Sequence, residues 1–193
     1  MYELIILKIL IQRPAHGYLI AKIINKILGP FAKMSNGRLY PLLSKLEQDG
    51  LIIAYEEATD ESEGGRHVRS YKITEAGGQR FHELMMDTTS NPGEYQKLFL
   101  QKVSAFDYLT PAERLRLIDH YLNYCQSHLL YLTTATEELG QNRAKSSDGP
   151  TYPDRIINTM QHLVEQWQLE LNWAKKLHQR ELAQSQNDTL IKL

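Results

Sequence analysis

Apolar positions in the first fifty residues recur at spacings that predict short helices. The run from Tyr2 to Gln12 is almost continuously apolar. Its β-branched content also permits a strand, so periodicity alone does not decide between the two. The run ends at Arg13-Pro14, because the residue before a proline is pushed out of the helical conformation. A second apolar face, which predicts a helix closed by Gly29-Pro30, consists of Leu19, Ile20, Ile23, Ile24 and Ile27.

The third segment, from Ser35 to Glu47, predicts a helix with one buried face. Its apolar stripe consists of Leu39, Leu42, Leu43 and Leu46. Ser35 is placed to cap the helix with its side-chain oxygen, and Gly50 is placed to end it in the left-handed conformation. Two helices joined by a short connection predict a helix-turn-helix whose second helix is the recognition element.

After Gly50 the period changes to the alternation of β-strands. The runs 51–55 and 70–73 alternate, and a polar, glycine-bearing stretch covers 56–67 between them. This pattern predicts a β-hairpin with a long tip, or wing. Its outgoing side is acidic, so the alternative is a hairpin whose mixed charges only keep the protein soluble.

From Thr74 onward the spacing is helical to the end of the chain. Thr110-Pro111 and Glu113 predict a helix start with a capping box. We expect Gly140 to end that helix and a polar loop to cover 141–151. The fold class is therefore mainly α with a small β-hairpin wing. We expect a winged helix-turn-helix domain at 1–87, a helical dimerisation domain at 88–184 and a loose tail at 185–193.

The two long helices carry apolar residues at alternating spacings of three and four, which is typical of helix–helix seams. Such seams favour a homodimer, whose two-fold symmetry would match a two-fold DNA site. The alternative is that the seams pack on each other within one chain. The residues that we expect at the dimer interface are Leu163, Trp167, Leu171 and Ala174.

The start of the third helix gathers cationic and polar side chains. A helix N-terminus favours anions through its dipole and its unpaired amides. Lys, Arg and Asn there suit phosphates and base edges, although an ordinary solvated helix face is the alternative. The predicted base or near-base contacts are Asn36, Arg38 and Tyr40, next to the capping Ser35. The predicted phosphate contacts are Lys33, Lys45 and, on the wing, Arg66 and Arg69.

The ordered motifs of the first eighty residues carry a family resemblance. These motifs are His16-Gly17-Tyr18, the run from Gly37 to Leu43, Leu46-Glu47, Gly50-Leu51-Ile52, Gly65-Arg66 and the run from Tyr71 to Thr74. In order and spacing the chain resembles the PadR family of bacterial transcriptional regulators. The resemblance implies a winged helix-turn-helix that works as a homodimer, usually a repressor, with a helical C-terminal part that completes the dimer. Arg38 departs from the family, which more often has a small residue there.

The resemblance also implies that a small phenolic or other aromatic effector releases the DNA. Aromatic residues beside a polar group are typical of pockets for flat compounds. Any one of these side chains is more often a core residue, so core packing is the alternative. The candidate effector residues are Tyr124, His128, Tyr131 and Trp167.

Composition narrows the functional classes. A net charge of −1 and a pI of about 6.7 exclude bulk electrostatic binding of nucleic acid, so any DNA contact must be a local patch. A single cysteine, no leader pattern and no apolar run of membrane length favour the cytoplasm. The seven histidines show no metal-ligand spacing, and no phosphate-binding glycine loop is present. We therefore expect no enzyme, metal or cofactor. The competing class is a helical adaptor whose winged domain docks to protein and has no affinity for DNA.

Overall fold

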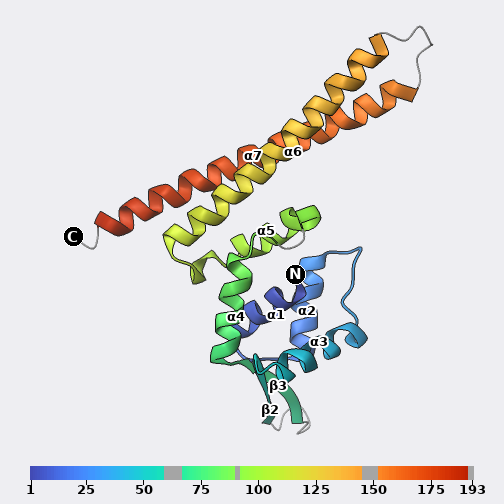
Figure 1. The fold of residues 1–193 in the computed structure, drawn as a ribbon. Coiled ribbons are helices and arrows are strands. Elements are labelled where there is room, and N and C mark those ends of the chain that lie inside the picture. Colours follow the sequence, from blue (N-terminus) through green and yellow to red (C-terminus); the bar gives the residue numbers. More distant parts are fainter. Residues whose placement is uncertain (59–66, 90–91, 145–151, 191–193) are drawn as a thin grey trace. The chain divides into compact units, whose positions relative to one another are not determined.

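The computed structural model describes residues 1–58, 67–89, 92–144 and 152–190, which fold as two compact units, Met1–Ala105 and Phe106–Leu193 (Figure 1). The first unit contains α1 (Tyr2–Gln12), β1 (Ala15–His16), α2 (Gly17–Leu28), α3 (Asn36–Gln48), β2 (Ile52–Ala58), β3 (His67–Ile73), α4 (Glu75–Met86), a 3-10 turn (Pro92–Glu94) and α5 (Tyr95–Val103). The second contains a 3-10 turn (Phe106–Tyr108), α6 (Pro111–Ala144) and α7 (Tyr152–Leu190). The predicted fold class, mainly helical with a small β wing, is confirmed.

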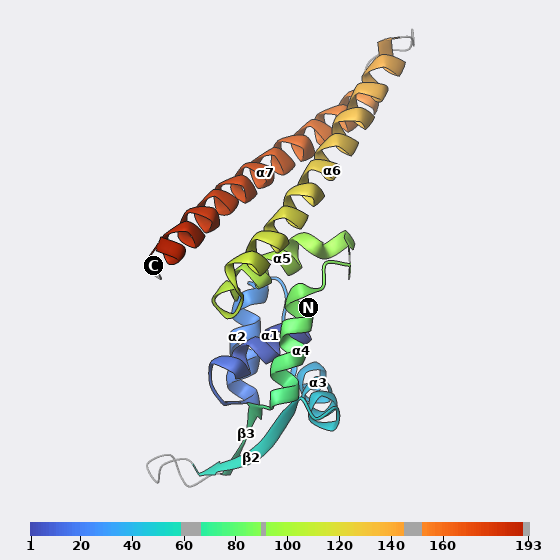
Figure 2. The same cartoon turned by 60° about the vertical axis from the view of Figure 1, so that its left-hand side comes forward.

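Burial determines the conformation of the first segment, where periodicity did not. Six of the eleven residues of α1 are buried, so this helix is apolar on most of its surface and lies in the core. Figure 2 shows α1 crossing beside α2 and α4. The helix ends at Arg13, whose φ of −167° and ψ of 154° are extended, as expected before Pro14.

The sheet has one strand more than the sequence predicted. Its order is β1-β3-β2, with β3 in the centre and antiparallel to both neighbours. The two outer strands are β1, in which Ala15 pairs with Tyr71, and β2, in which Ile52 pairs with Ile73. The predicted hairpin is confirmed, and its strands are longer than expected, so Glu56 lies in β2 and not in the tip. The strand that was not predicted is β1, whose two residues are too few to show an alternation of apolar and polar positions.

Thr74 joins the wing to α4. Its hydroxyl oxygen accepts the Gly77 amide (3.0 Å) as the cap of α4, and lies 2.7 and 3.0 Å from the carbonyl oxygens of Gly50 and Leu51. The Thr74 amide donates to the Leu51 carbonyl (3.1 Å). The end of the α3 turn, the start of the wing and the start of α4 are thus held at one residue.

Two lysines attach α5 to the rest of the first unit. The fully buried Lys102 donates to the Asp87 carbonyl, and its ammonium lies 5.6 Å from the centroid of the Tyr95 ring. Burial lowers the pKa of Lys102 to about 8. Lys8 of α1 donates to the Ser104 hydroxyl (2.5 Å). The first compact unit therefore extends to Ala105, beyond the boundary at residue 87 that composition indicated.

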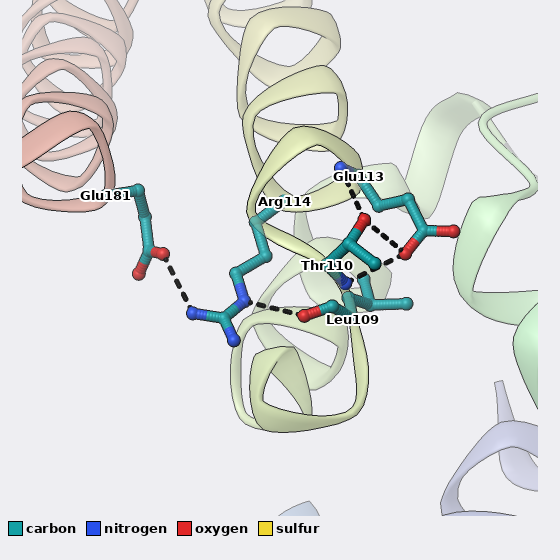
Figure 3. A network of polar contacts seen from close by, with 5 residues as sticks. All are labelled: Leu109, Thr110, Glu113, Arg114 and Glu181. Atoms are coloured by element: carbon teal, nitrogen blue, oxygen red, sulfur yellow. Dashed lines mark hydrogen bonds and ion pairs between the residues drawn. The ribbon is translucent and has the colours of Figure 1, made fainter. Parts of the chain in front are cut away.

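The predicted capping box is present at the start of α6. The Glu113 carboxylate accepts the Thr110 amide (2.8 Å), and the Thr110 hydroxyl oxygen accepts the Glu113 amide (3.4 Å) (Figure 3). In the next position, Arg114 donates to the Leu109 carbonyl (3.0 Å) and to Glu181 of α7 (3.3 Å). Together with the bond between Tyr121 and Glu170 (2.5 Å), this pair sets the antiparallel register of the two long helices.

Both long helices extend beyond the ends that the sequence indicated. Helix α6 runs to Ala144 through Gly140, which we expected to end it. Glycine in a helix interior costs only about 1 kcal/mol relative to alanine, and Gly140 does not have the positive φ of an end residue. Helix α7 continues to Leu190, past residue 185, where we expected the loose tail to begin.

Candidate nucleic-acid interface

The exposed residues of α3 lie on two flanks. Of the predicted apolar stripe, Leu39, Leu43 and Leu46 are buried and Leu42 is half-buried. Residues three or four apart lie on the same side of a helix, so Asn36 and Tyr40 share one flank. Arg38 and Lys45, seven apart, share the other. The candidate DNA contacts of α3 therefore do not form a single row.

The N-terminus of α3 is open to an anion. Ser35 occupies the N-cap position, but its side chain makes no capping bond, which corrects the prediction. Its carbonyl accepts the amides of Arg38 and Leu39 (3.0 Å each). Among the described residues, none accepts a hydrogen bond from the Asn36 or Gly37 amide. These two donors point out of the first turn, where a negative group is favoured.

A cleft lies between α2 and this N-terminus, with a volume of about 540 Å³. We call it the α2–α3 cleft. The described side chains that line it include no acidic residue. They are Tyr18, Ala21, Lys22, Asn25, Lys33, Met34, Ser35 and Asn36. Lys33, Ser35 and Asn36 were predicted as DNA contacts, and the structure brings them together here.

Lys22 is a cation of the α2–α3 cleft that was not predicted from the sequence. It is exposed on α2, on the side opposite the buried Ile20 and Ile24, and it lies across the cleft wall from α3. The connection before α3 is fixed by Asn25, whose side chain accepts the Met34 amide (2.6 Å) and donates to its carbonyl (3.4 Å). The sequence did place Lys22 on the polar face of an amphipathic helix. That pattern does not indicate which element lies opposite Lys22.

The second flank of α3 faces α1 and α4. The guanidinium carbon of Arg38 lies 5.8 Å from the centroid of the Tyr2 ring. Lys45 lines a smaller cavity, about 270 Å³, together with Glu3, Asp49 and Arg80. Arg80 is itself paired with Glu3 (2.8 Å). This second cavity has mixed charge and attracts phosphate less than the α2–α3 cleft does.

On the wing, the structure gives Arg69 a protein partner. Its Nη2 lies 3.0 and 2.7 Å from the two carboxylate oxygens of Glu47, in the last turn of α3. Its guanidinium carbon lies 5.8 Å from the centroid of the Tyr71 ring, and burial raises the pKa of Tyr71 while the Arg69 charge lowers it. Arg66, the other predicted wing contact, lies outside the described residues.

The comparison with protein families gives a similarity for the first unit. Residues 6–83 match the Transcriptional regulator PadR-like family. Over this range, which is less than half of the chain, the chain is PadR-like. The matched range covers the α2–α3 cleft, α3 and both wing strands. A family of transcriptional regulators agrees with the expectation that this PadR-like chain is not an enzyme.

Solved structures resemble the PadR-like chain at low identity. Bacillus subtilis PadR in complex with operator DNA is 20% identical, over 92% of this chain and 96% of that one, with a TM-score of 0.42. Bacillus subtilis PadR in complex with p-coumaric acid is 20% identical, over 93% of this chain and 94% of that one, with a TM-score of 0.37. A transcriptional regulator from Clostridium thermocellum is 22% identical, over 56% of this chain and 92% of that one, with a TM-score of 0.37. No curated protein matched. The similarity to the PadR-like family covers residues 6–83.

The second unit of the PadR-like chain contains the predicted effector residues, and three of the four come together. The His128 ring stacks on Trp167 (centroids 4.2 Å apart, 23° between planes) and lies 4.3 Å from the Tyr124 ring. Tyr131 is 72% exposed and takes no part in the described ring contacts. Rings at these distances touch each other, so they fill the space between α6 and α7.

The predicted dimer residues are also partly used within the chain. Leu171 and Ala174 are buried in the single chain, and Trp167 stacks on His128 of α6. Cys125, in the α6 seam, is buried as well, and burial raises the pKa of its thiol to about 12. The open alternative, in which the seams pack on each other within one chain, therefore holds for Leu171 and Ala174.

In the part of the chain that the structure describes, no three His, Cys, Asp or Glu side chains gather as metal ligands. None of its described helices is both long and apolar enough to span a bilayer.

Proposed function

We propose that this PadR-like chain is a cytoplasmic transcriptional regulator that binds double-stranded operator DNA, as a homodimer and in the manner of a repressor. The observation that carries the proposal is the α2–α3 cleft. In a protein of net charge −1, this cleft places two lysines beside the free amides of a helix N-terminus and holds no described acidic side chain. Such a local site is what phosphate binding by a protein without net positive charge requires.

The arrangement of α3 supports a division of roles. A phosphate held in the α2–α3 cleft would fix the position of the helix N-terminus on the DNA backbone. Asn36 and Tyr40 then face one side of the groove, and Arg38 faces the other. Tyr40 is 46% exposed, and a Cβ at Gly17 would lie 3.0 Å from its hydroxyl, so α2 supports this ring closely. The backbone contact gives affinity, and the side chains of α3 give sequence preference.

Fluorescence anisotropy on the DNA upstream of the protein's own gene and on a scrambled duplex tests the proposal. We expect tight binding to the upstream DNA that weakens steeply between ~50 and ~200 mM salt. Absence of binding to either duplex, by protein shown to carry no bound ligand, would favour the adaptor, which has no affinity for DNA.

Arg38→Ala should reduce discrimination between operator and random DNA by about 1–3 kcal/mol, the range for a lost base contact. Arg38→Lys is the matched variant, because it keeps the charge and loses the planar donor fork. Both variants are measured on both duplexes. Equal weakening of Arg38→Ala on the two DNAs would assign Arg38 to a phosphate.

The dimer is proposed through apolar side chains that the single chain leaves exposed on its second unit. Leu130 and Tyr131 on α6 and Leu169 on α7 are 69%, 72% and 72% exposed. A contiguous exposed apolar patch is typical of a surface that a partner covers, and we propose that these side chains belong to one. Substitutions at Leu171 or Ala174 would be ambiguous, because these residues pack within the chain.

Leu130→Glu combined with Leu169→Glu should therefore give monomers in size-exclusion chromatography with light scattering. The helical content of the chain should not change, because both side chains are exposed in it, and circular dichroism checks this. A dimer that survives both substitutions would place the interface elsewhere.

The effector is proposed to be a small aromatic acid or phenol that binds the DNA-incompetent dimer more tightly. A hundredfold preference corresponds to about 2.7 kcal/mol. Because Tyr124, His128 and Trp167 are in contact, a ligand between α6 and α7 would have to separate these rings. Titration of p-coumaric acid, the ligand in one Bacillus subtilis PadR structure, into the DNA complex is the first test. Release of DNA supports this part of the proposal, and unchanged binding rejects this compound.

A further inference from the structure

We propose that Glu47 masks the charge of Arg69, so that this part of the wing adds no phosphate contact and non-specific DNA binding stays low. The inference rests on the proposed function, because it concerns the same DNA-binding unit. Glu47 lies in the last turn of the recognition helix, whereas Arg69 lies in the central strand, 22 residues later. Their side chains are 32% and 61% exposed, so the pair lies at the protein surface.

The carboxylate of Glu47 neutralises the guanidinium of Arg69 but accepts hydrogen bonds from only one of its three nitrogens. A single nitrogen, Nη2, donates to both oxygens of Glu47, at 3.0 and 2.7 Å. Among the described residues, none accepts from Nε or Nη1 of Arg69. Arg69 therefore has donors that fit a phosphate, and the carboxylate beside it cancels the attraction. The Tyr71 ring, 5.8 Å away, limits where the guanidinium can move.

A second acid adds to this effect. Glu56 lies opposite Arg69 in the register of β2 and β3. The groove between α3 and the wing, about 410 Å³ in volume, is lined by Glu47, Ala54, Tyr55, Glu56 and Arg69. The described lining thus contains two carboxylates for one guanidinium, and carboxylates repel a phosphate.

The two ends of the interface therefore have opposite electrostatic character. The α2–α3 cleft has lysines and no described acid, whereas the groove beside the wing has an excess of acid. A regulator must find its site among a large excess of other DNA, so the ratio of specific to non-specific affinity matters more than affinity alone. An acid that removes one sequence-independent contact lowers the background of bound protein.

The experiment compares Glu47→Gln with the wild-type chain on upstream and scrambled DNA across a salt series. Glutamine keeps the shape of the side chain and removes its charge. We expect the slope of log K against log[salt] to become steeper by about 0.9, and affinity at ~0.1 M salt to rise about eightfold on both DNAs. Arg69→Ala in the wild-type background should leave the slope unchanged, and Arg69→Ala added to Glu47→Gln should return it to the wild-type value.

Glu94→Gln is the matched control. It changes the net charge equally and removes another exposed ion pair, with Lys97 (3.3 Å), away from the wing. Its salt slope should equal that of the wild type. Thermal unfolding of each variant shows that the compared proteins are folded.

Four results would overturn the proposal that Glu47 masks Arg69. A loss of affinity in Glu47→Gln would make Glu47 a residue that positions Arg69. A slope reduced by about 0.9 in Arg69→Ala alone would mean that Arg69 binds phosphate with Glu47 in place. Wild-type protein that binds no DNA would remove the proposed function and this inference with it. Wild-type binding with an unchanged slope in Glu47→Gln would remove the inference only.

Discussion

Replacing Lys22 and Lys33 together by alanine is expected to weaken binding to every duplex about 60-fold at ~0.1 M salt and to reduce the salt slope by about 1.8. The reason is that each lysine of the α2–α3 cleft neutralises one phosphate and releases its counterions. Because phosphate contacts do not depend on sequence, upstream and scrambled DNA should lose affinity by the same factor. Anisotropy titrations at several salt concentrations measure both quantities.

The control is the pair Lys175→Ala and Lys176→Ala, two exposed lysines of α7. It removes the same charge from the second unit of the chain. We expect an unchanged slope, which would separate a local contact from the effect of net charge. Equal slopes for the two double variants would mean that the α2–α3 cleft does not hold phosphate.

Gly77→Ala is expected to destabilise the first unit by about 3 kcal/mol or more, which is the upper range for overpacking. A Cβ at Gly77 would overlap the carbonyl oxygen of Leu51 and lie 2.7 Å from Cγ1 of Ile73. The Leu51 oxygen cannot move freely, because it accepts the Thr74 amide. The substitution therefore separates α4 from the base of the wing.

Gly78→Ala, one residue later in the same helix, is the matched control. A Cβ there meets nothing within 4 Å. Replacing a helical glycine by alanine without a clash should stabilise the unit by roughly 0.5–1 kcal/mol. Urea denaturation followed by circular dichroism measures both variants. The two tryptophans, Trp167 and Trp173, lie in the second unit, so the tryptophan fluorescence transition should stay the same. Equal destabilisation of the two variants would contradict the close packing at Gly77.

Local signals in the sequence were sufficient for several elements of both units. The stripe of Leu39, Leu43 and Leu46, the stop at Gly50 and the capping box at Thr110 each depend on residues within one or two helical turns. The alternation of the wing strands is local as well. Each of these features is fixed by the backbone period and by caps, so the pattern of one segment contains the information.

The remaining site features depend on contacts between distant segments. Lys22 joins the α2–α3 cleft because α2 lies beside the start of α3, and Arg69 meets Glu47 because β3 passes the end of α3. The sequence lists these cations but not their neighbours. The seams of the long helices have the same ambiguity, because periodicity identifies an apolar stripe without identifying the surface that covers Leu171 and Ala174.

The joint at Thr74 has a mechanical consequence. One hydroxyl contacts the carbonyls that follow α3 and caps α4, and β3 ends at the residue before it. The recognition helix, the wing and α4 are therefore all connected at Thr74, through contacts of 2.7 to 3.0 Å. A rotation applied at the far end of α4 would turn α3 and the wing together. It would leave the position of α3 relative to the wing unchanged.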